Sequence, residues 1–358
     1  MSPVVLDQLL ESCVCNNGSD LHIKADSPPL VRVHGDLIPL DMEALSADEV
    51  KWLAYSNLSE TQRTRFEEEL ELDFAYEIKG LARFRGNLYS QRNNIGAAYR
   101  VIPYEIRSLD DLGLPAVTRT FSERPRGLVL VTGPAGSGKS TTQAAMIDYI
   151  NGKLPVHIIT IEDPVEFVHT DRQALINQRE LDTDTLAFPN ALRSALREDP
   201  DVILIGEMRD LETIQLAITA AETGHLVFGT LHTTDAVQTV DRVIDVFPTH
   251  QQQQVRMQMS VNLLGVISQT LVKRVDGEGR MAVFETLVAI PAVRNLIRES
   301  KTYQIGSIIQ TGQRHGMQTL DQSLAALVQQ KLISYEEGLG KAANETEFKT
   351  LLGTAGKP

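Results

Sequence analysis

Four short, mainly apolar runs mark the second half of the chain, and longer stretches that suit helices separate them. A short apolar run without alternation is typical of a strand that is covered on both faces. Strands that take turns with helices predict a parallel sheet with crossover helices. The runs lie at residues 128–131, 156–161, 202–205 and 226–228. We therefore predict an α/β fold over residues 127–358.

The first hundred residues show a different pattern, in which short strand-like segments flank one charged helical stretch. That stretch, residues 46–71, opens with a capping box of Ser46 and Glu49 and ends in a charged run, which predicts a solvated face. The remaining segments predict a hairpin and three further strands. They lie at residues 30–33, 37–38, 72–78, 82–89 and 97–102.

The strand predicted at residues 82–89 has two distinct faces. Alternation places Phe84 and Leu88 on one face, with Arg83, Arg85 and Asn87 on the other. Two arginines and an amide on one exposed face are slightly more than a half-buried strand requires.

A connector separates the two patterns. Residues 103–126 carry three prolines and mixed charge, with little periodicity. A chain of 358 residues is long enough for two domains with a core each. We therefore predict a small α+β domain over residues 1–102, a linker over 103–126 and a larger domain over 127–358.

The segment after the first apolar run matches the phosphate-binding pattern G-x-x-x-x-G-K-[ST], and a helix-compatible stretch, residues 141–150, follows it. Its glycines let consecutive N–H groups turn towards phosphate oxygens, and the helix start adds a positive end. Lys139 supplies a charge for the outer phosphates, and Ser140 supplies a hydroxyl for Mg²⁺. We therefore predict a site for ATP and Mg²⁺. The residues expected to bind the nucleotide are Gly133, Pro134, Ala135, Gly136, Ser137, Gly138, Lys139, Ser140 and Thr141.

Acidic residues and a histidine follow the other three runs. Glu162, Asp163 and Glu166 come after the second run, Glu207 after the third and His232 after the fourth. In open α/β sheets the chemistry gathers beyond the carboxyl ends of the strands. These side chains are therefore expected to converge on the phosphate loop.

Phosphoryl transfer needs charge neutralisation, an aligned water and an acceptor for its proton. We expect Glu207 to hold Mg²⁺ together with the loop hydroxyl, directly or through water. Glu166 is our choice for polarising the attacking water, with Glu162 and Asp163 as open alternatives. His232 is expected to donate a hydrogen bond to the terminal phosphate.

Taken together, these segments resemble the secretion-superfamily ATPases, and within them the type IV pilus retraction ATPases of the PilT family. The resemblance is carried by the phosphate loop, the acidic box at residues 162–166, the segment 195–210 and the histidine box at 223–233. Residues 292–301 are also similar to a C-terminal motif of the retraction motors, with mild departures at Val293 and Ser300. The sister assembly and secretion ATPases usually carry a four-cysteine metal insertion, which this chain lacks.

The resemblance implies a RecA-like P-loop NTPase domain preceded by a smaller, PAS-like α+β domain. It further implies a homo-hexamer in which closure of the N-terminal domain against a neighbour drives pilus retraction and twitching motility. In such a ring an arginine of one subunit reaches the phosphate bound by the next, and we expect Arg85 and Arg100 in that role, with Arg83 next. The implied partners are an inner-membrane platform protein of the pilus and a paralogous retraction ATPase.

Composition adds further limits. A net charge of −13 argues against direct binding of nucleic acid. No apolar stretch approaches the roughly 18 residues of a membrane span, and no export signal is recognised. Cys13 and Cys15 are the only cysteines, which fits a reducing compartment. We therefore expect a cytoplasmic protein, and the resemblance implies that it is peripheral at the inner face of the cell membrane.

Other functions stay open at this point. An ATPase of pilus extension or type II secretion would share the same boxes. A nucleotide-gated accessory subunit would share the loop but hydrolyse ATP weakly. A ring helicase would also share the loop, but the acidic balance disfavours it.

Overall fold

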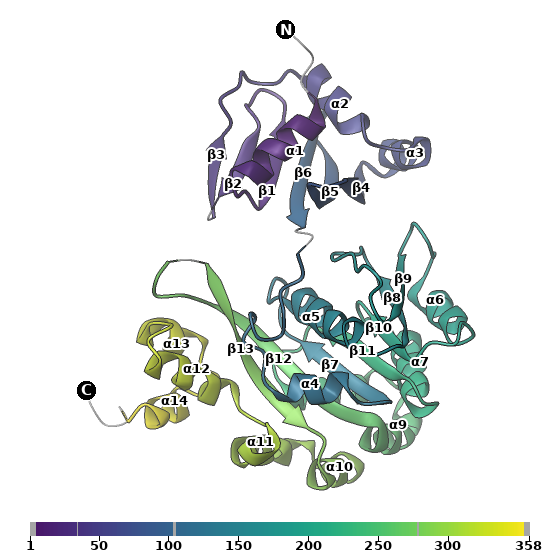
Figure 1. Ribbon diagram of the computed structural model, residues 1–358, viewed down its shortest axis with the longest axis vertical. Coiled ribbons are helices and arrows are strands. Elements are labelled where there is room, and N and C mark those ends of the chain that lie inside the picture. The colour runs from purple at the N-terminus through teal and green to yellow at the C-terminus, as the bar shows by residue number, and fades with distance from the viewer. Residues whose placement is uncertain (1–4, 34, 103–104, 278, 354–358) are drawn as a thin grey trace. The chain divides into compact units, whose positions relative to one another are not determined.

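The structure is a computed structural model that describes residues 5–33, 35–102, 105–277 and 279–353. It contains two compact units (Figure 1): Met1–Glu105 with Pro164–Val168, and Ile106–Asp163 with His169–Pro358. The predicted mixed α/β architecture is confirmed. Residues 106–126 of the predicted connector belong to the second unit, whereas its Pro103 lies outside the described residues.

The N-terminal unit is built on a six-stranded sheet in the order β3-β2-β1-β6-β5-β4, with all neighbouring pairs antiparallel. Its helices cover fully buried sheet residues such as Leu21, Phe84 and Tyr99. The predicted hairpin and the three later strands are confirmed. The elements are α1 (Leu6–Cys15), β1 (Asp20–Lys24), β2 (Leu30–Val33), β3 (Asp36–Pro39), α2 (Ala47–Tyr55), α3 (Glu60–Glu69), β4 (Glu71–Ile78), β5 (Ala82–Gln91) and β6 (Asn94–Ile102).

Strand β5 shows the alternation that the sequence predicts. Phe84 and Leu88 are fully buried. Arg83, Arg85 and Asn87 are partly exposed on the opposite face. This face is therefore polar, as expected from the sequence.

The helical character predicted for residues 46–71 is confirmed, and the structure divides this stretch into α2 and α3. The Ser59 hydroxyl accepts a hydrogen bond from the Gln62 N–H across 3.2 Å, and the Gln62 side chain accepts one from the Ser59 N–H across 3.0 Å. This second capping box satisfies backbone donors in the same way as the predicted box at Ser46, and so starts a new helix. The charged run is largely exposed, as predicted, but Phe66 within it is buried in the core.

The second unit is built on a seven-stranded sheet in the order β13-β12-β7-β11-β10-β8-β9, in which only β12 and β13 pair antiparallel among the described residues. The four predicted strands and their parallel arrangement are confirmed. Strands β9, β12 and β13 were not predicted, because each mixes polar with apolar residues. The strands are β7 (Gly127–Thr132), β8 (His157–Glu162), β9 (Leu175–Glu180), β10 (Val202–Ile205), β11 (Leu226–Leu231), β12 (Leu263–Lys273) and β13 (Arg280–Val288).

Helices cover both faces of this sheet, which explains the apolar runs. Leu128 and Leu130 of β7 belong to a core with residues of α6 to α11, whereas Val129 belongs to a second core with residues of α4 and α5. Helix α4 lies inside the predicted connector and buries Phe121 in that second core. These helices are α4 (Val117–Ser122), α5 (Lys139–Asn151), α6 (Phe188–Ala195), α7 (Leu211–Glu222), α8 (Ala236–Asp245) and α9 (Thr249–Asn262).

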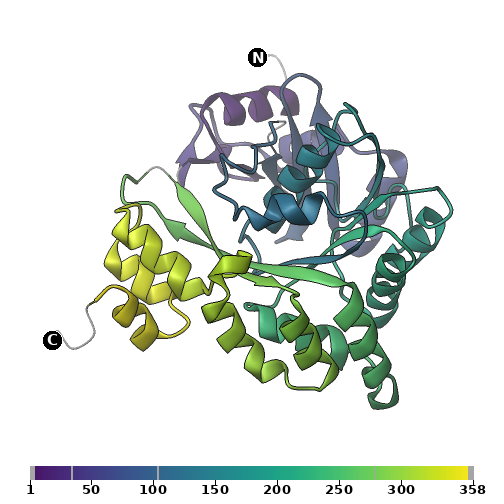
Figure 2. The ribbon, with the colours of Figure 1, turned by 60° about the horizontal axis from the view of Figure 1, so that its bottom comes forward.

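The C-terminal helices form two groups (Figure 2). Helix α10 is amphipathic and buries Val293 and Ile297 in the first core. Helices α12 to α14 share a small core with Val272 and Val283 of the β12–β13 hairpin. None of the described helices is long and apolar enough to cross a membrane. The elements are α10 (Pro291–Arg298), η1 (Thr302–Gln304), α11 (Ile305–Thr311), η2 (Gln313–His315), α12 (Leu320–Gln329), α13 (Tyr335–Lys341) and α14 (Glu345–Leu351).

Candidate nucleotide-binding site

Four neighbouring strands of the second unit carry predicted site residues to one edge of the sheet. Strands β7, β11, β10 and β8 are successive parallel neighbours, so their carboxyl ends lie side by side. The phosphate loop follows β7, and His232 follows β11. Glu207 lies two residues beyond β10, and Glu162 ends β8. Strand β11 therefore stands between the loop strand and the strand of Glu207.

The phosphate loop has a backbone that depends on its glycines. Gly133, Gly136 and Gly138 have φ angles of +143°, +72° and +88°, which residues with side chains rarely adopt. Gly133 is also crowded, because a Cβ there would lie 2.2 Å from the backbone oxygen of Gln269. The outer residues of the loop, 134–136, are exposed. Their backbone is therefore accessible to a ligand.

The start of helix α5 places a cation within the curl of the loop. Lys139 Nζ donates hydrogen bonds to the carbonyl oxygens of Gly133 and Pro134, across 2.9 and 3.1 Å. Ser140 follows in the first helical turn and is half-buried. Lys139, predicted to bind the phosphates, and Ser140, predicted to bind Mg²⁺, are thus adjacent to the loop.

Two further features fit a bound polyphosphate. The Ser137 hydroxyl is buried and has no hydrogen-bond partner among the described residues, a state that a phosphate oxygen would relieve. Helix α5 has 13 residues, and its first turn includes the half-buried Thr141. This turn contains no acidic residue, so no carboxylate there offsets the positive end of the helix dipole. These donors suit phosphate, and the Ser140 oxygen suits Mg²⁺.

Strand β12 supports the loop from the other side of β7. Gln269 Nε2 donates to the Ser137 carbonyl oxygen across 2.7 Å, and Gln269 Oε1 accepts from the Thr142 hydroxyl across 2.8 Å. All three residues are buried. Beside them, the hydroxyls of Ser268 and Thr132 are 2.7 Å apart. One buried amide therefore ties the loop, the first turn of α5 and strand β12 together.

Glu207 is the charged centre of the sheet edge. Its Oε1 lies 2.6 Å from Arg209 Nε and 2.8 Å from His232 Nε2. Burial raises the pKa of Glu207, but Arg209 and His232 outweigh burial and hold that pKa below its usual value. The carboxylate is therefore ionised at neutral pH and fixed in position. His232 donates from Nε2 in this contact, so its Nδ1 can donate to a phosphate only when the ring is protonated.

The acidic box is divided between the two units. Glu162, at the end of β8, accepts hydrogen bonds from the Thr160 hydroxyl across 2.6 Å and from Gln178 Nε2 across 3.2 Å. Glu166 belongs to Pro164–Val168, which is part of the N-terminal unit. Its side chain is half-buried and has no hydrogen bond or ion pair among the described residues.

In the N-terminal unit, Arg85 and Arg100 are direct cross-strand partners on β5 and β6. Arg100 Nε donates to Asp20 Oδ1 across 2.9 Å while 70% of its side chain stays exposed, and Arg85 Nε lies 4.0 Å from Asp73 Oδ1. Arg83 is partly buried on the same face. Like charges directly opposite each other repel, so the flanking aspartates stabilise the pair. Two neighbouring guanidinium groups suit a phosphate.

Comparison with known proteins identifies the family. Residues 103–278 match the model of a family described as type II/IV secretion system protein. The chain is 54% identical over 343 residues to the type IV pilus retraction ATPase PilT of Pseudomonas aeruginosa, which covers 96% of this chain and 99% of that protein. The chain belongs to the PilT family.

Two further comparisons agree with this membership. A twitching motility protein of Neisseria gonorrhoeae is 56% identical over 316 residues, covering 88% of this PilT-family chain and 84% of the relative. The crystal structure of the pilus retraction motor PilT with bound ADP matches with a TM-score of 0.91 and 45% identity, covering 97% and 99% of the two chains. This PilT-family chain is accordingly an ATP-binding, ATP-hydrolysing enzyme.

Two residues of the PilT-family site were missed in the sequence analysis. Arg209 lies two residues after Glu207, and its charge was a usable signal for an ion pair. Gln269 offered no comparable signal, because its hydrogen bond to Ser137 joins residues 132 positions apart.

Replacing Gln269 by leucine is expected to weaken ATP binding without removing it. The change leaves the Ser137 carbonyl and the Thr142 hydroxyl unpaired in a buried place, at a cost of about 1–3 kcal/mol. We therefore expect the KM for ATP to rise about tenfold, as measured by phosphate release at varied ATP concentration. Gln254→Leu, at an exposed glutamine of α9, is the control. An unchanged KM in Gln269→Leu would show that the amide does not support the loop.

Proposed function

We propose that this chain is a hexameric, Mg²⁺-dependent ATPase motor that powers type IV pilus retraction and thereby twitching motility. The observation that carries the proposal is the 54% identity to the retraction ATPase PilT over 96% of this chain and 99% of that protein. The position of the phosphate loop, His232 and Glu207 at one sheet edge supports the chemistry.

The phosphate loop and the residues at the strand ends would bind different parts of the Mg²⁺–ATP complex. Loop N–H groups and Lys139 would hold the phosphates, while Ser140 would hold Mg²⁺, which neutralises charge on the β- and γ-phosphates when bound. We assign Glu207 to the water shell of the metal, because strand β11 separates its strand from the loop strand. The described residues also contain no cluster of three or more acidic, histidine or cysteine side chains that could hold a metal. His232, in its protonated form, would donate to the terminal phosphate through Nδ1, because Nε2 already donates to Glu207.

Glu166 would polarise the attacking water. Two of the other carboxylates near strand ends are occupied, because Glu162 accepts two side-chain hydrogen bonds and Glu207 pairs with Arg209. A carboxylate occupied by donors has fewer lone pairs for a water molecule. Glu166 has no such competitor among the described residues, which favours it as the base.

In a ring, the arginine pair of one subunit would complete the site of its neighbour. Arg85 and Arg100 would stabilise the charge of the transferred phosphoryl group in trans. Nucleotide binding and release would then close and open the N-terminal domain against the neighbouring ATPase domain. We propose an inner-membrane platform protein and a paralogous retraction ATPase as partners, with the chain at the cytoplasmic face of that membrane.

Deletion of the gene in its own organism is expected to increase surface pili and abolish twitching, because fibres would extend without being withdrawn. Electron microscopy counts the pili, and the diameter of the twitching zone measures motility. Complementation with the wild-type gene should restore both. Bald cells would instead assign the chain to pilus extension, and unchanged piliation with unchanged twitching would contradict a motor function at the pilus.

A further inference from the structure

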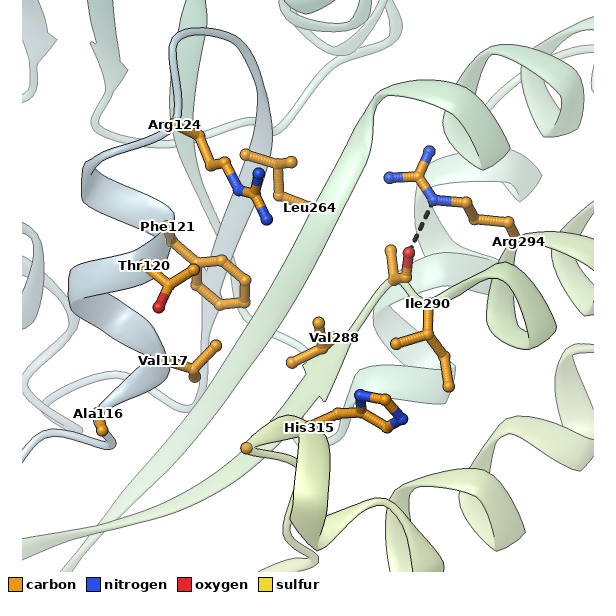
Figure 3. A pocket seen from close by; sticks show the side chains of 12 residues that line it. Ala116, Val117, Thr120, Phe121, Arg124, Leu264, Val288, Ile290, Arg294 and His315 are labelled. Atoms are coloured by element: carbon orange, nitrogen blue, oxygen red, sulfur yellow. Dashed lines mark hydrogen bonds between the residues drawn. The ribbon is translucent and has the colours of Figure 1, made fainter.

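A pocket of about 460 Å³ lies in the second unit, and none of its lining residues belongs to the nucleotide site. Figure 3 shows it between helix α4 on one side and α10 with η2 on the other. Leu264 of β12 and Val288 of β13 lie between these two sides. The volume is in the range of ordinary binding pockets.

Two arginines point towards each other across this pocket (Figure 3). Arg294 donates from Nε to the Ala289 carbonyl across 2.7 Å, from Nη1 to the Ser260 carbonyl across 3.1 Å and from Nη2 to the Leu263 carbonyl across 3.2 Å. These bonds fix the guanidinium, but no acidic side chain among the described residues forms an ion pair with it. Burial lowers the pKa of Arg294, and so do the charges of Arg124 and another arginine of α10.

The pocket is cationic although the chain carries a net charge of −13. Its lining includes Arg124, Arg294 and His315 but no carboxylate. Arg124 is exposed, and its side chain makes no hydrogen bond or ion pair with the described residues. The guanidinium of Arg124 is therefore available to a negatively charged group from outside.

The floor of the pocket is apolar. It is formed by Val117 and Phe121 of α4 together with Leu264, Val288 and Ile290. A free inorganic anion would leave this floor uncovered. An anionic group next to a large apolar side chain would instead contact both the arginines and the apolar floor. Exposed charges around an apolar centre, with arginine prominent, are typical of protein interfaces. Pockets for small metabolites enclose most of their ligand instead.

We infer that this pocket binds a short acidic segment of a protein partner. An Asp or Glu of the segment would lie between Arg124 and Arg294, and a neighbouring large apolar side chain would cover Phe121 and Val288. Because the guanidinium of Arg294 is already fixed, it loses little conformational entropy on binding. The inference rests on the proposed function only in that a motor needs a partner to act on.

The test uses the purified full-length chain and a fluorescein-labelled peptide, Asp-Leu-Glu-Phe-Asp-Leu, with Asn-Leu-Gln-Phe-Asn-Leu as its uncharged counterpart. Fluorescence anisotropy should show binding of the acidic peptide only, and binding should weaken as salt is added. Arg124→Glu and Thr120→Glu, the latter at a threonine of α4 that also lines the pocket, should each weaken binding at least about tenfold. Arg126→Glu, which changes the charge equally at an exposed arginine outside the pocket, should bind as the wild type does.

ATP hydrolysis should be unchanged in all three variants, because none of them alters a residue of the nucleotide site. Equal binding of both peptides, no binding of either, or undiminished binding by Arg124→Glu would each overturn the inference. Arg124-dependent binding of phosphatidylglycerol vesicles without binding of the peptide would overturn it in favour of a lipid surface. If gene deletion left piliation unchanged while the peptide still bound through Arg124, the proposed function alone would fail.

Discussion

Replacing Lys139 by alanine should abolish ATP hydrolysis and weaken ATP binding at least about a hundredfold. The ammonium lies within the curl of the phosphate loop, where the carbonyl oxygens of Gly133 and Pro134 hold it. On binding, it would transfer to the outer phosphates. Without it, the loop would offer those phosphates only N–H groups and the positive end of α5. Calorimetric titration with ATP and Mg²⁺ measures the affinity, and phosphate release measures the rate.

Lys153→Ala is the matched control for this change, because Lys153 lies just beyond the other end of α5. It removes a lysine that pairs with Glu123 at the surface, so ATP affinity should stay as in the wild type. Thermal melting of both variants checks that they fold. Near-wild-type ATP affinity in a folded Lys139→Ala variant would remove the loop from nucleotide binding.

A Glu166→Gln variant should retain ATP and lose at least about a hundredfold in turnover. Glutamine keeps the size of the side chain but cannot accept the proton of the attacking water. Affinity should be unchanged, because we assign Glu166 to neither the phosphates nor the metal. Steady-state phosphate release gives kcat, and titration with ATP gives the affinity separately.

Glu162→Gln provides the comparison for this prediction. Glu162 is engaged by Thr160 and Gln178, so its replacement should disturb the end of β8 and lower kcat less than Glu166→Gln does. A larger loss in Glu162→Gln, with Glu166→Gln close to the wild type, would transfer the role of base to Glu162. Equal and complete inactivity of the wild type and both variants would favour a nucleotide-gated subunit over a motor.

The sequence predicts the sheet edge well because the determinants are local. A buried strand in a parallel sheet must be apolar along its length, and whatever follows it lies at the carboxyl edge. His232 and Glu207 could therefore be placed beside the phosphate loop before the strand order was known. The strand order itself depends on pairing between distant segments, and the sequence alone does not give it.

The residue that supports the phosphate loop was not predictable either, because it too depends on contacts between distant segments. Gln269 lies in a strand whose polar and apolar residues are mixed, and its partners are Ser137 and Thr142, far away in the chain. The break between α2 and α3 was missed for a different reason. Ser59 and Gln62 form a local capping signal, which was not identified within the predicted helical stretch.

The β12–β13 hairpin joins the loop to the C-terminal helices. Gln269 holds the phosphate loop, and Val272, three positions along the same strand, is buried among α12 to α14. A strand is extended and rises about 3.3 Å per residue. Gln269 and Val272 are therefore held at a fixed separation along β12. If the loop shifts on phosphate release, strand β12 would pass that shift to the C-terminal helices.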